Sequence, residues 1–140
     1  MTKAEQFEAL ALRCEQATGP DRELDLVVWS LCVPGVTRKH TSYFHKASGS
    51  EYVIDETRDA TGRLIIVPAY SASLDAARQI DTSALIVFAS DIGADGLPMV
   101  KVVNNTSTSP VVEHTGIART LELAWCAASL RARAQMERGK

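Results

Sequence analysis

A long apolar helical pattern near the carboxyl end constrains the fold of this chain more than any other feature. Residues 116–133 contain no proline, and alanine and leucine dominate the segment. Two apolar rows at helical spacing leave only a narrow polar strip. The rows are Ile117, Leu121, Ala124 and Ala128, and Leu123, Ala127, Leu130 and Ala134. Because such a helix needs other elements around it, we predict that it is buried.

The composition fits a single globular domain over residues 1–140. Hydrophobic residues make up 46% and charged residues 23%, which argues against disorder. A formal charge of -2 provides no positive field for a nucleic acid polymer or an acidic membrane. No apolar run approaches the roughly 18 residues of a membrane span, and residues 1–6 lack the apolar core of a signal peptide. We therefore expect a cytoplasmic protein.

The cysteines favour a structural role. Cys14, Cys32 and Cys126 are odd in number, far apart and set in apolar helical contexts, which is typical of reduced core thiols. With no Cys-x-x-Cys pair among them, a catalytic thiol would need partners that only the fold brings together. No other residues have the spacing of a metal site, so we expect no metal and no cofactor.

The amino-terminal part predicts two helices and a hairpin. An amphipathic helix over residues 3–18 ends at Gly19-Pro20, and a second helix follows over 21–32 with acids in its first turn. The hairpin spans 36–54 and contains the basic and aromatic stretch Arg38 to Lys46. Two interpretations of this stretch stand: a site for an anionic ligand with a ring, or a solvated edge strand.

The rest of the chain predicts a sheet with helices. The expected elements are buried strands at 63–67 and 84–89, a short serine-capped helix at 74–80, an antiparallel return at 99–103, a polar loop at 104–110 and a lead-in at 111–115 to the last helix. The strand at 63–67 should be central. The order of elements predicts an α+β fold, a three-layer α/β/α-type sandwich whose antiparallel or mixed sheet is covered by helices.

Three blocks of sequence resemble the phage ABA-sandwich domain family. They are TGPDRELD at 18–25, PAYSASLDAA at 68–77 and LELAWCAASLRAR at 121–133, in that family's order and approximate spacing over residues 8–133. Two features depart from the family: the strand at 84–89 lacks the expected tryptophan, and residues 118–120 replace the usual Thr-Pro-Ala entry to the last helix. Members are small phage and prophage proteins, so the resemblance implies a phage protein acting in the host cytoplasm.

By analogy with other small phage proteins, the resemblance implies a sponge. Such a protein sequesters a nucleotide-derived immune signal, of cyclic ADP-ribose type or a cyclic oligonucleotide, and counteracts anti-phage defence without catalysis. Arginines or helix ends would hold phosphates, and aromatic or apolar walls would hold bases. The expected ligand-binding residues are Arg22, Tyr70, Ser71, Ser73, Arg119 and Arg131, with Tyr43, His45 and His114 as wall or lid residues. A structural pairing of Arg22 with Glu23 or Asp25 is an equal alternative.

Two other function classes fit the sequence. One is a protein-interaction or assembly module without a small ligand, and a homo-oligomer would suit this class as well as the sponge. The other is a metal-independent nucleotide hydrolase. Its candidate acids and bases are scattered and match no catalytic motif: Asp55, Glu56, Glu113, His40, His45 and His114. We therefore expect that the protein is not an enzyme.

Overall fold

The computed structural model describes residues 1–81, 84–90, 96–104 and 112–139, with the backbone alone for 84–90 and 104. The elements are α1 (Lys3–Gln16), α2 (Arg22–Cys32), β1 (Thr37–His45), β2 (Ser50–Arg58), α3 (Leu74–Ala77), β3 (Ala84–Ser90), β4 (Met99–Asn104), β5 (Glu113–Ile117) and α4 (Leu121–Arg138). They form one antiparallel sheet of order β1-β2 and another of order β3-β4-β5. The predicted α+β class is confirmed.

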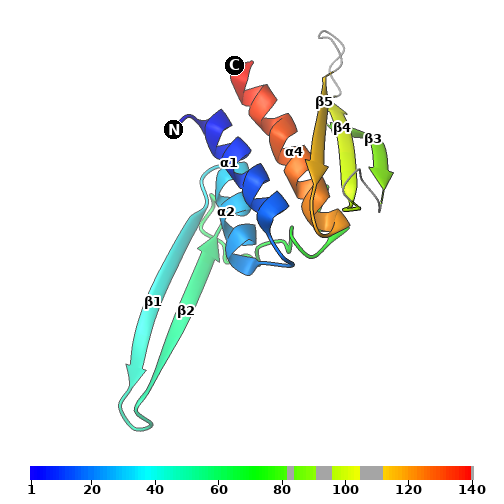
Figure 1. Cartoon of the computed structure of the whole chain (residues 1–140). Coiled ribbons are helices and arrows are strands. Elements are labelled where there is room, and N and C mark those ends of the chain that lie inside the picture. Colours follow the sequence, from blue (N-terminus) through cyan, green and yellow to red (C-terminus); the bar gives the residue numbers. More distant parts are fainter. Residues whose placement is uncertain (82–83, 91–95, 105–111, 140) are drawn as a thin grey trace.

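The helices gather beside the three-stranded sheet. α4 packs on β4 and β5, and α1 packs on α4, while the β1-β2 hairpin projects away from the body (Figure 1). Both helices that contact the sheet lie on the same side of it (Figure 1). Among the described residues, no helix covers the second face of the sheet. The three-layer arrangement is therefore not shown.

The last helix starts later than the sequence predicts. Thr120 caps its amino terminus, and the Thr120 hydroxyl accepts a hydrogen bond from the Leu123 amide at 3.2 Å. Residues 113–117 instead form β5, where Gly116 pairs with Val100. The predicted lead-in is thus a strand, and Ile117 belongs to the sheet. The predicted burial is confirmed for the second apolar row, which consists of Leu123, Ala127, Leu130 and Ala134.

A glycine allows α4 to lie directly on β5. A Cβ atom added at Gly116 would be 2.0 Å from the Ala124 carbonyl oxygen and 2.7 Å from the Ala128 amide nitrogen. Both distances are shorter than any real contact, so the strand and helix backbones touch only because position 116 has no side chain. Small residues at 124 and 128 complete this close approach.

The two amino-terminal helices are confirmed. α1 opens with a capping box between Thr2 and Glu5, and Asp21 caps α2 by accepting hydrogen bonds from the Glu23 amide at 3.0 Å and the Leu24 amide at 3.2 Å. Leu24, Val28 and Trp29 are buried. On the same helix, Val27, Leu31 and Cys32 are only half-buried.

The predicted central strand at 63–67 is wrong. This segment is extended, but its β-pairing with the described residues is limited to one bridge, between Arg58 and Leu64. It runs along the base of β2, and Ile66 is 92% exposed. A continuous apolar run is typical of a strand covered on both faces. Here only Val67 is fully buried.

Three smaller predictions have mixed outcomes. The predicted helix at 74–80 is one turn, α3, capped by Ser73. The loop at 104–110 and the side chains of the strand at 84–89 lie outside the described residues. The thiols are free, as expected: Cys14 and Cys126 are buried and Cys32 is half-buried.

Replacing Gly116 with alanine should destabilise the fold by about 3 kcal/mol or more, because the new methyl group must displace the α4 backbone. Gly19→Ala is the matched control, since a Cβ at position 19 meets nothing within 4 Å. Denaturant unfolding of both variants measures the difference. Equal stabilities would contradict the close contact between β5 and α4.

Candidate functional site

The sequence blocks at 18–25, 68–77 and 121–133 meet inside the body of the protein. In the first block, the buried Asp25 carboxylate accepts a hydrogen bond from the Ser71 amide of the second block at 2.7 Å. The Ser71 hydroxyl accepts from the Asp21 amide at 2.8 Å and lies 3.2 Å from the Asp21 carbonyl oxygen, to which it donates. In the third block, the Cys126 thiol donates to the Tyr70 carbonyl oxygen at 3.0 Å. The blocks therefore hold one another together.

Arg22 takes part in the same network. Its guanidinium donates to the Asp25 carboxylate at 3.0 Å and to the carbonyl oxygens of Val67 at 2.9 Å and Pro68 at 3.3 Å. These three acceptors fix the guanidinium against the turn that starts the second block. Of the two interpretations of Arg22, the structure shows the pairing with Asp25, and Glu23 instead pairs with Arg38.

The candidate residues of the second block are largely enclosed. Tyr70 and Ser71 are buried, and burial raises the pKa of the Tyr70 phenol to about 12. The Ser73 hydroxyl accepts a hydrogen bond from the Ala76 amide at 3.3 Å, which is its role as the cap of α3. The polar groups of Ser71 and Ser73 are thus occupied within the chain.

Arg131 is also engaged in structural contacts. Its guanidinium makes a bidentate ion pair with Glu15 of α1 and donates to the Thr115 carbonyl oxygen at 2.6 Å. The Glu15 carboxylate accepts a further hydrogen bond from the Ile117 amide at 2.9 Å. Arg131 therefore joins α4 to α1 and β5, where an incoming phosphate would have to replace Glu15.

His114 lies near the start of β5, and Arg119 lies in the segment that joins β5 to α4. The His114 Nε2 atom is buried and has no hydrogen-bond partner among the described residues, and burial lowers the pKa of this imidazole. Arg119 is exposed just before α4, and its guanidinium forms no hydrogen bond or ion pair within the described part of the chain. Arg119 is thus the candidate arginine whose charge is available to solvent.

Tyr43 and His45 lie far from these residues, on the projecting hairpin β1-β2, which we call the arm (Figure 1). The rings of Tyr43 and Tyr52 stack with centroids 5.4 Å apart and planes at 17°. His45 Nδ1 is 2.9 Å from the Ser48 hydroxyl in the turn. The nine candidates are therefore spread over the arm, the body and the β5 exit, and do not line one cavity of the described chain.

The basic side chains at the base of the arm are paired with acids. Arg38 donates to both Glu23 carboxylate oxygens, at 2.9 and 3.2 Å, and its Nε lies 3.6 Å from Asp55. His40 Nδ1 lies 2.6 Å from the same Asp55 carboxylate. Of the two interpretations of the stretch Arg38 to Lys46, these exposed pairs favour wet surface over an anion pocket.

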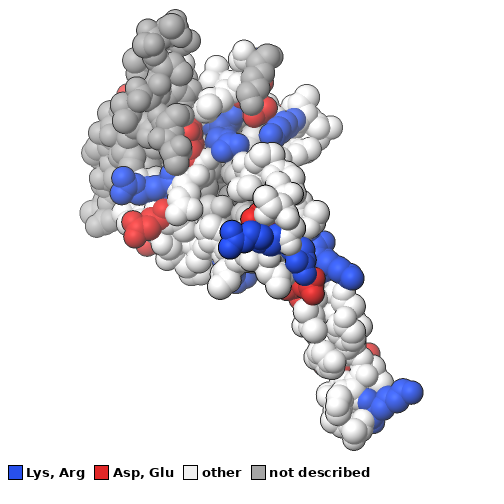
Figure 2. All heavy atoms as spheres, turned by 180° about the vertical axis from the view of Figure 1, so that it is seen from behind, with Lys and Arg blue, Asp and Glu red and all other residues white. Residues whose placement is uncertain are grey.

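The sequence reasoning missed the apolar surface of the arm. Large apolar side chains are exposed on both strands: Tyr43, Phe44, Tyr52, Val53 and Ile54. Figure 2 shows lysine or arginine at the base and the tip of the arm, with a mostly uncharged stretch between. The run Tyr52-Val-Ile in a strand beside Tyr43-Phe44 was the available signal, because it leaves neither face of the hairpin polar.

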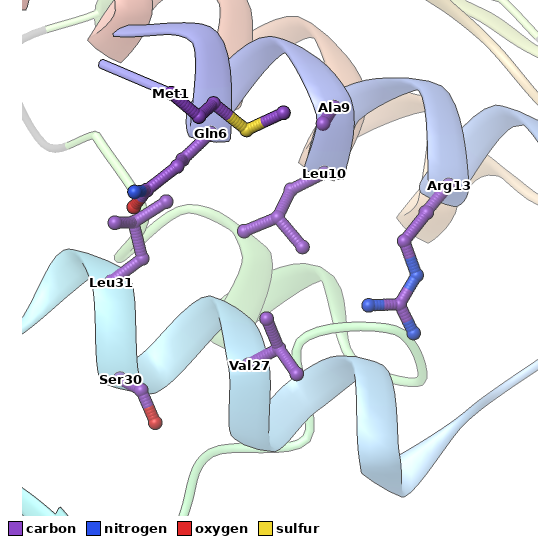
Figure 3. Close-up of a pocket in the computed structure, with 8 residues that line it drawn as sticks. All are labelled: Met1, Gln6, Ala9, Leu10, Arg13, Val27, Ser30 and Leu31. Atoms are coloured by element: carbon purple, nitrogen blue, oxygen red, sulfur yellow. The ribbon is translucent and has the colours of Figure 1, made fainter. Parts of the chain in front are cut away.

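A groove of about 410 Å³ lies between α1 and α2 (Figure 3). Its walls are mostly apolar and include Met1, Leu10, Val27 and Leu31, with Arg13 at one end. None of the nine candidate residues lines it.

The described residues contain no group of three histidine, cysteine or acidic side chains able to hold a metal ion. Burial raises the pKa of the Cys32 thiol to about 11, so this thiol stays protonated at neutral pH. No helix within the described ranges is long and apolar enough to cross a membrane.

Comparisons with protein-family models, curated proteins and solved structures found no match to this chain.

The Glu15–Arg131 contact predicts a pH dependence of stability. Burial alone would raise the pKa of Glu15, but the hydrogen bonds from Arg131 and the Ile117 amide outweigh it, so the pKa falls below its ordinary value of 4.5. The stabilisation is therefore complete above pH 4.5 and is lost as the pH falls through the folded-state pKa.

Glu15→Gln should cost about 1–3 kcal/mol at neutral pH and flatten the fall in stability below about pH 4.5. Glu51→Gln on the arm is the control, because Glu51 makes no hydrogen bond or ion pair with the described residues. Unfolding free energies measured from pH 7 to pH 3 test this. An unchanged acid slope in Glu15→Gln would mean that the ion pair is absent in solution.

Proposed function

We propose that this protein is a non-catalytic binding module that docks on another protein through its arm. The observation that carries the proposal is the exposure of large apolar side chains on both faces of the arm. Tyr43, Tyr52 and Ile54 lie on one face, and Phe44 and Val53 lie on the other. Phe44 is 61% exposed and Val53 is 52% exposed.

Physical chemistry favours a covered arm. A two-stranded ribbon by itself is at best marginally stable in water, because it buries little apolar surface. Apolar surface gathered on one projecting element marks protein interaction sites more often than scattered exposed residues do. Aromatic side chains are also the residues that most often anchor protein interfaces. A partner protein would supply the burial that the arm lacks.

The titratable groups of the arm support binding over catalysis. His40 is held by Asp55 and His45 by Ser48, and both pairs are exposed to water. His45 contacts the Ser48 hydroxyl, but no described carboxylate orients the His45 ring, and no described hydroxyl or thiol is hydrogen-bonded to the His40 ring that Asp55 orients. Neither pair therefore completes the set of nucleophile, base and orienting group within the described residues. We therefore carry forward the expectation that the protein is not an enzyme.

A photo-crosslinking amino acid at position 44 should give discrete protein adducts in cells that contain the natural partner. The same amino acid at position 12 is the control, because Leu12 is 50% exposed on α1, away from the arm. Denaturing gels and mass spectrometry separate the products. Equal yields at both positions, or no adduct at position 44, would contradict docking through the arm.

Sequestration of a nucleotide signal is the second candidate function. The stacked, half-exposed Tyr43 and Tyr52 rings form a platform on which a base could stack, with His45 and Lys46 nearby in sequence.

The resemblance to the phage family supports a phage protein that acts in the host cytoplasm. The same resemblance suggests a second helical layer over the sheet. Arg119 is exposed and has no hydrogen bond or ion pair with the described residues, so it could meet a phosphate beside α4, away from the arm.

If the protein is a sponge, a cyclic dinucleotide, cyclic trinucleotide or ADP-ribose derivative should raise its melting temperature by several degrees. Mass analysis after denaturation should recover the ligand intact. Tyr43→Ala should reduce the shift if the base stacks on the arm, and Arg119→Ala should reduce it if the phosphate binds beside α4. Neither variant should lower the melting temperature of the free protein. If no compound shifts the melting temperature, the docking module remains as the proposed function. A ligand recovered in chemically altered form would indicate a hydrolase.

A further inference from the structure

We infer that the partner of the arm is a second copy of this chain, with β1 of one copy paired antiparallel with β1 of the other. This inference rests on the proposed function and names the partner. The two copies would be related by a two-fold axis through Thr41, so that β2-β1-β1-β2 becomes one continuous sheet. The argument depends on which edge of the arm is free and on what that edge carries.

The outer edge of β2 is partly occupied at its base. The Ile65 amide donates to the Thr57 carbonyl oxygen at 2.9 Å, and the Thr57 hydroxyl donates to the Ile65 carbonyl oxygen at 2.6 Å. Leu64 forms a bridge with Arg58 beside them. In contrast, β1 pairs with β2 alone in the described part of the chain. Among the described residues, the edge of β1 is therefore open along its whole length, whereas that of β2 is open only beyond its base.

The residues of β1 are complementary to their own reversed order. The base of the strand is basic, with Arg38 and Lys39, and the distal half is aromatic, with Tyr43 and Phe44. Antiparallel pairing centred on Thr41 sets Lys39 of one copy opposite Tyr43 of the other, and Arg38 opposite Phe44. Opposite residues share a face, so Lys39 comes to the Tyr43 ring, and the Arg38 side chain, whose guanidinium already pairs with Glu23 and Asp55, comes to the Phe44 ring. The two-fold axis makes each contact occur twice.

The same pairing of β2 with itself would be unfavourable. Around Ile54, it would set Val53 opposite Asp55 and Tyr52 opposite Glu56. Carboxylates would then lose water against apolar side chains without gaining a cation. The charges on the two strands therefore favour pairing through β1. The segment around Ile65, which occupies the base of the β2 edge, favours the same pairing.

Pairing through β1 also extends contacts already present in the arm. Tyr43 stacks on Tyr52 within one copy, and Lys39 lies opposite Glu56. In the joined sheet, the row across one face reads Tyr52 and Tyr43 from one copy, then Lys39 and Glu56 from the other. Each arm gains a strand-long set of backbone hydrogen bonds, which a two-stranded ribbon lacks.

Sedimentation velocity of the purified chain should show a dimer of about twice 15.2 kDa. Tyr43→Lys should weaken this dimer at least about tenfold, because it sets a lysine opposite Lys39 of the second copy. Combining Lys39→Tyr with Tyr43→Lys should restore association, since the exchanged pair is again a cation against a ring. Tyr52→Lys is the matched control: it removes the same ring stack but leaves the β1 edge intact, so it should still dimerise.

A cysteine at the two-fold axis tests the register. Thr41→Cys should form an intermolecular disulfide on mild oxidation, since directly opposed residues of antiparallel strands lie about 4.5–5.5 Å apart. Ile54→Cys, at the middle of β2, should not. Peptide mapping distinguishes this bond from one to a native cysteine.

The outcomes separate the inference from the function it rests on. A monomer at every concentration, combined with adducts to a different protein at position 44, would overturn the second copy as partner and leave the docking function standing. A dimer that Tyr43→Lys leaves intact, or one that Thr41→Cys fails to cross-link, would place self-association on another surface and also overturn the inference. A monomer with no adduct at position 44 would overturn both proposals.

Discussion

The contact of α4 with β5 is the constraint on which the rest of the body depends. Because Gly116 has no side chain, the strand lies against the helix backbone at Ala124 and Ala128. The close approach of α4 to β5 brings the polar groups of α4 within reach of other elements. Arg131 binds Glu15 of α1, while Arg133 donates to the Ile80 carbonyl oxygen at 2.9 Å and the Cys32 carbonyl oxygen at 3.3 Å. One helix thus fixes the sheet, α1 and the ends of two other segments.

The same packing explains why the most recognisable blocks of the sequence need not form a ligand site. Asp25 is 1% exposed, and its charge is balanced by Arg22 and by the Ser71 amide. A buried carboxylate is tolerated only with such partners, so the residues around it are constrained together whether or not a ligand exists. Arg22 and Asp25 of the first block and Ser71 of the second therefore serve as an internal joint between α2 and the turn that precedes α3.

Local patterns predicted the elements that depend on local chemistry. The helices over 3–16 and 22–32 follow from apolar spacing and caps, and the hairpin follows from the turn Gly49-Ser50 between two strand-like runs. The sequence could not place the segment at 63–67, because its apolar run looks the same at the edge of an arm as in a buried sheet. Nor could it predict β5, whose residues become a strand only because β4 lies beside them. The burial of Asp25 likewise depends on Ser71, 46 positions away.

The arm shows how charge order along a strand can determine its partner. Edge strands are usually protected by charges spread along their length, and such a strand repels a copy of itself. On β1, the charges are concentrated toward the base, and the rings occupy the distal half. A strand with this polarity is mismatched against a parallel copy, which would align cation with cation, and is matched against an antiparallel one. The change from basic to aromatic along β1 therefore disfavours parallel stacking of like strands and supports the proposed two-fold pair.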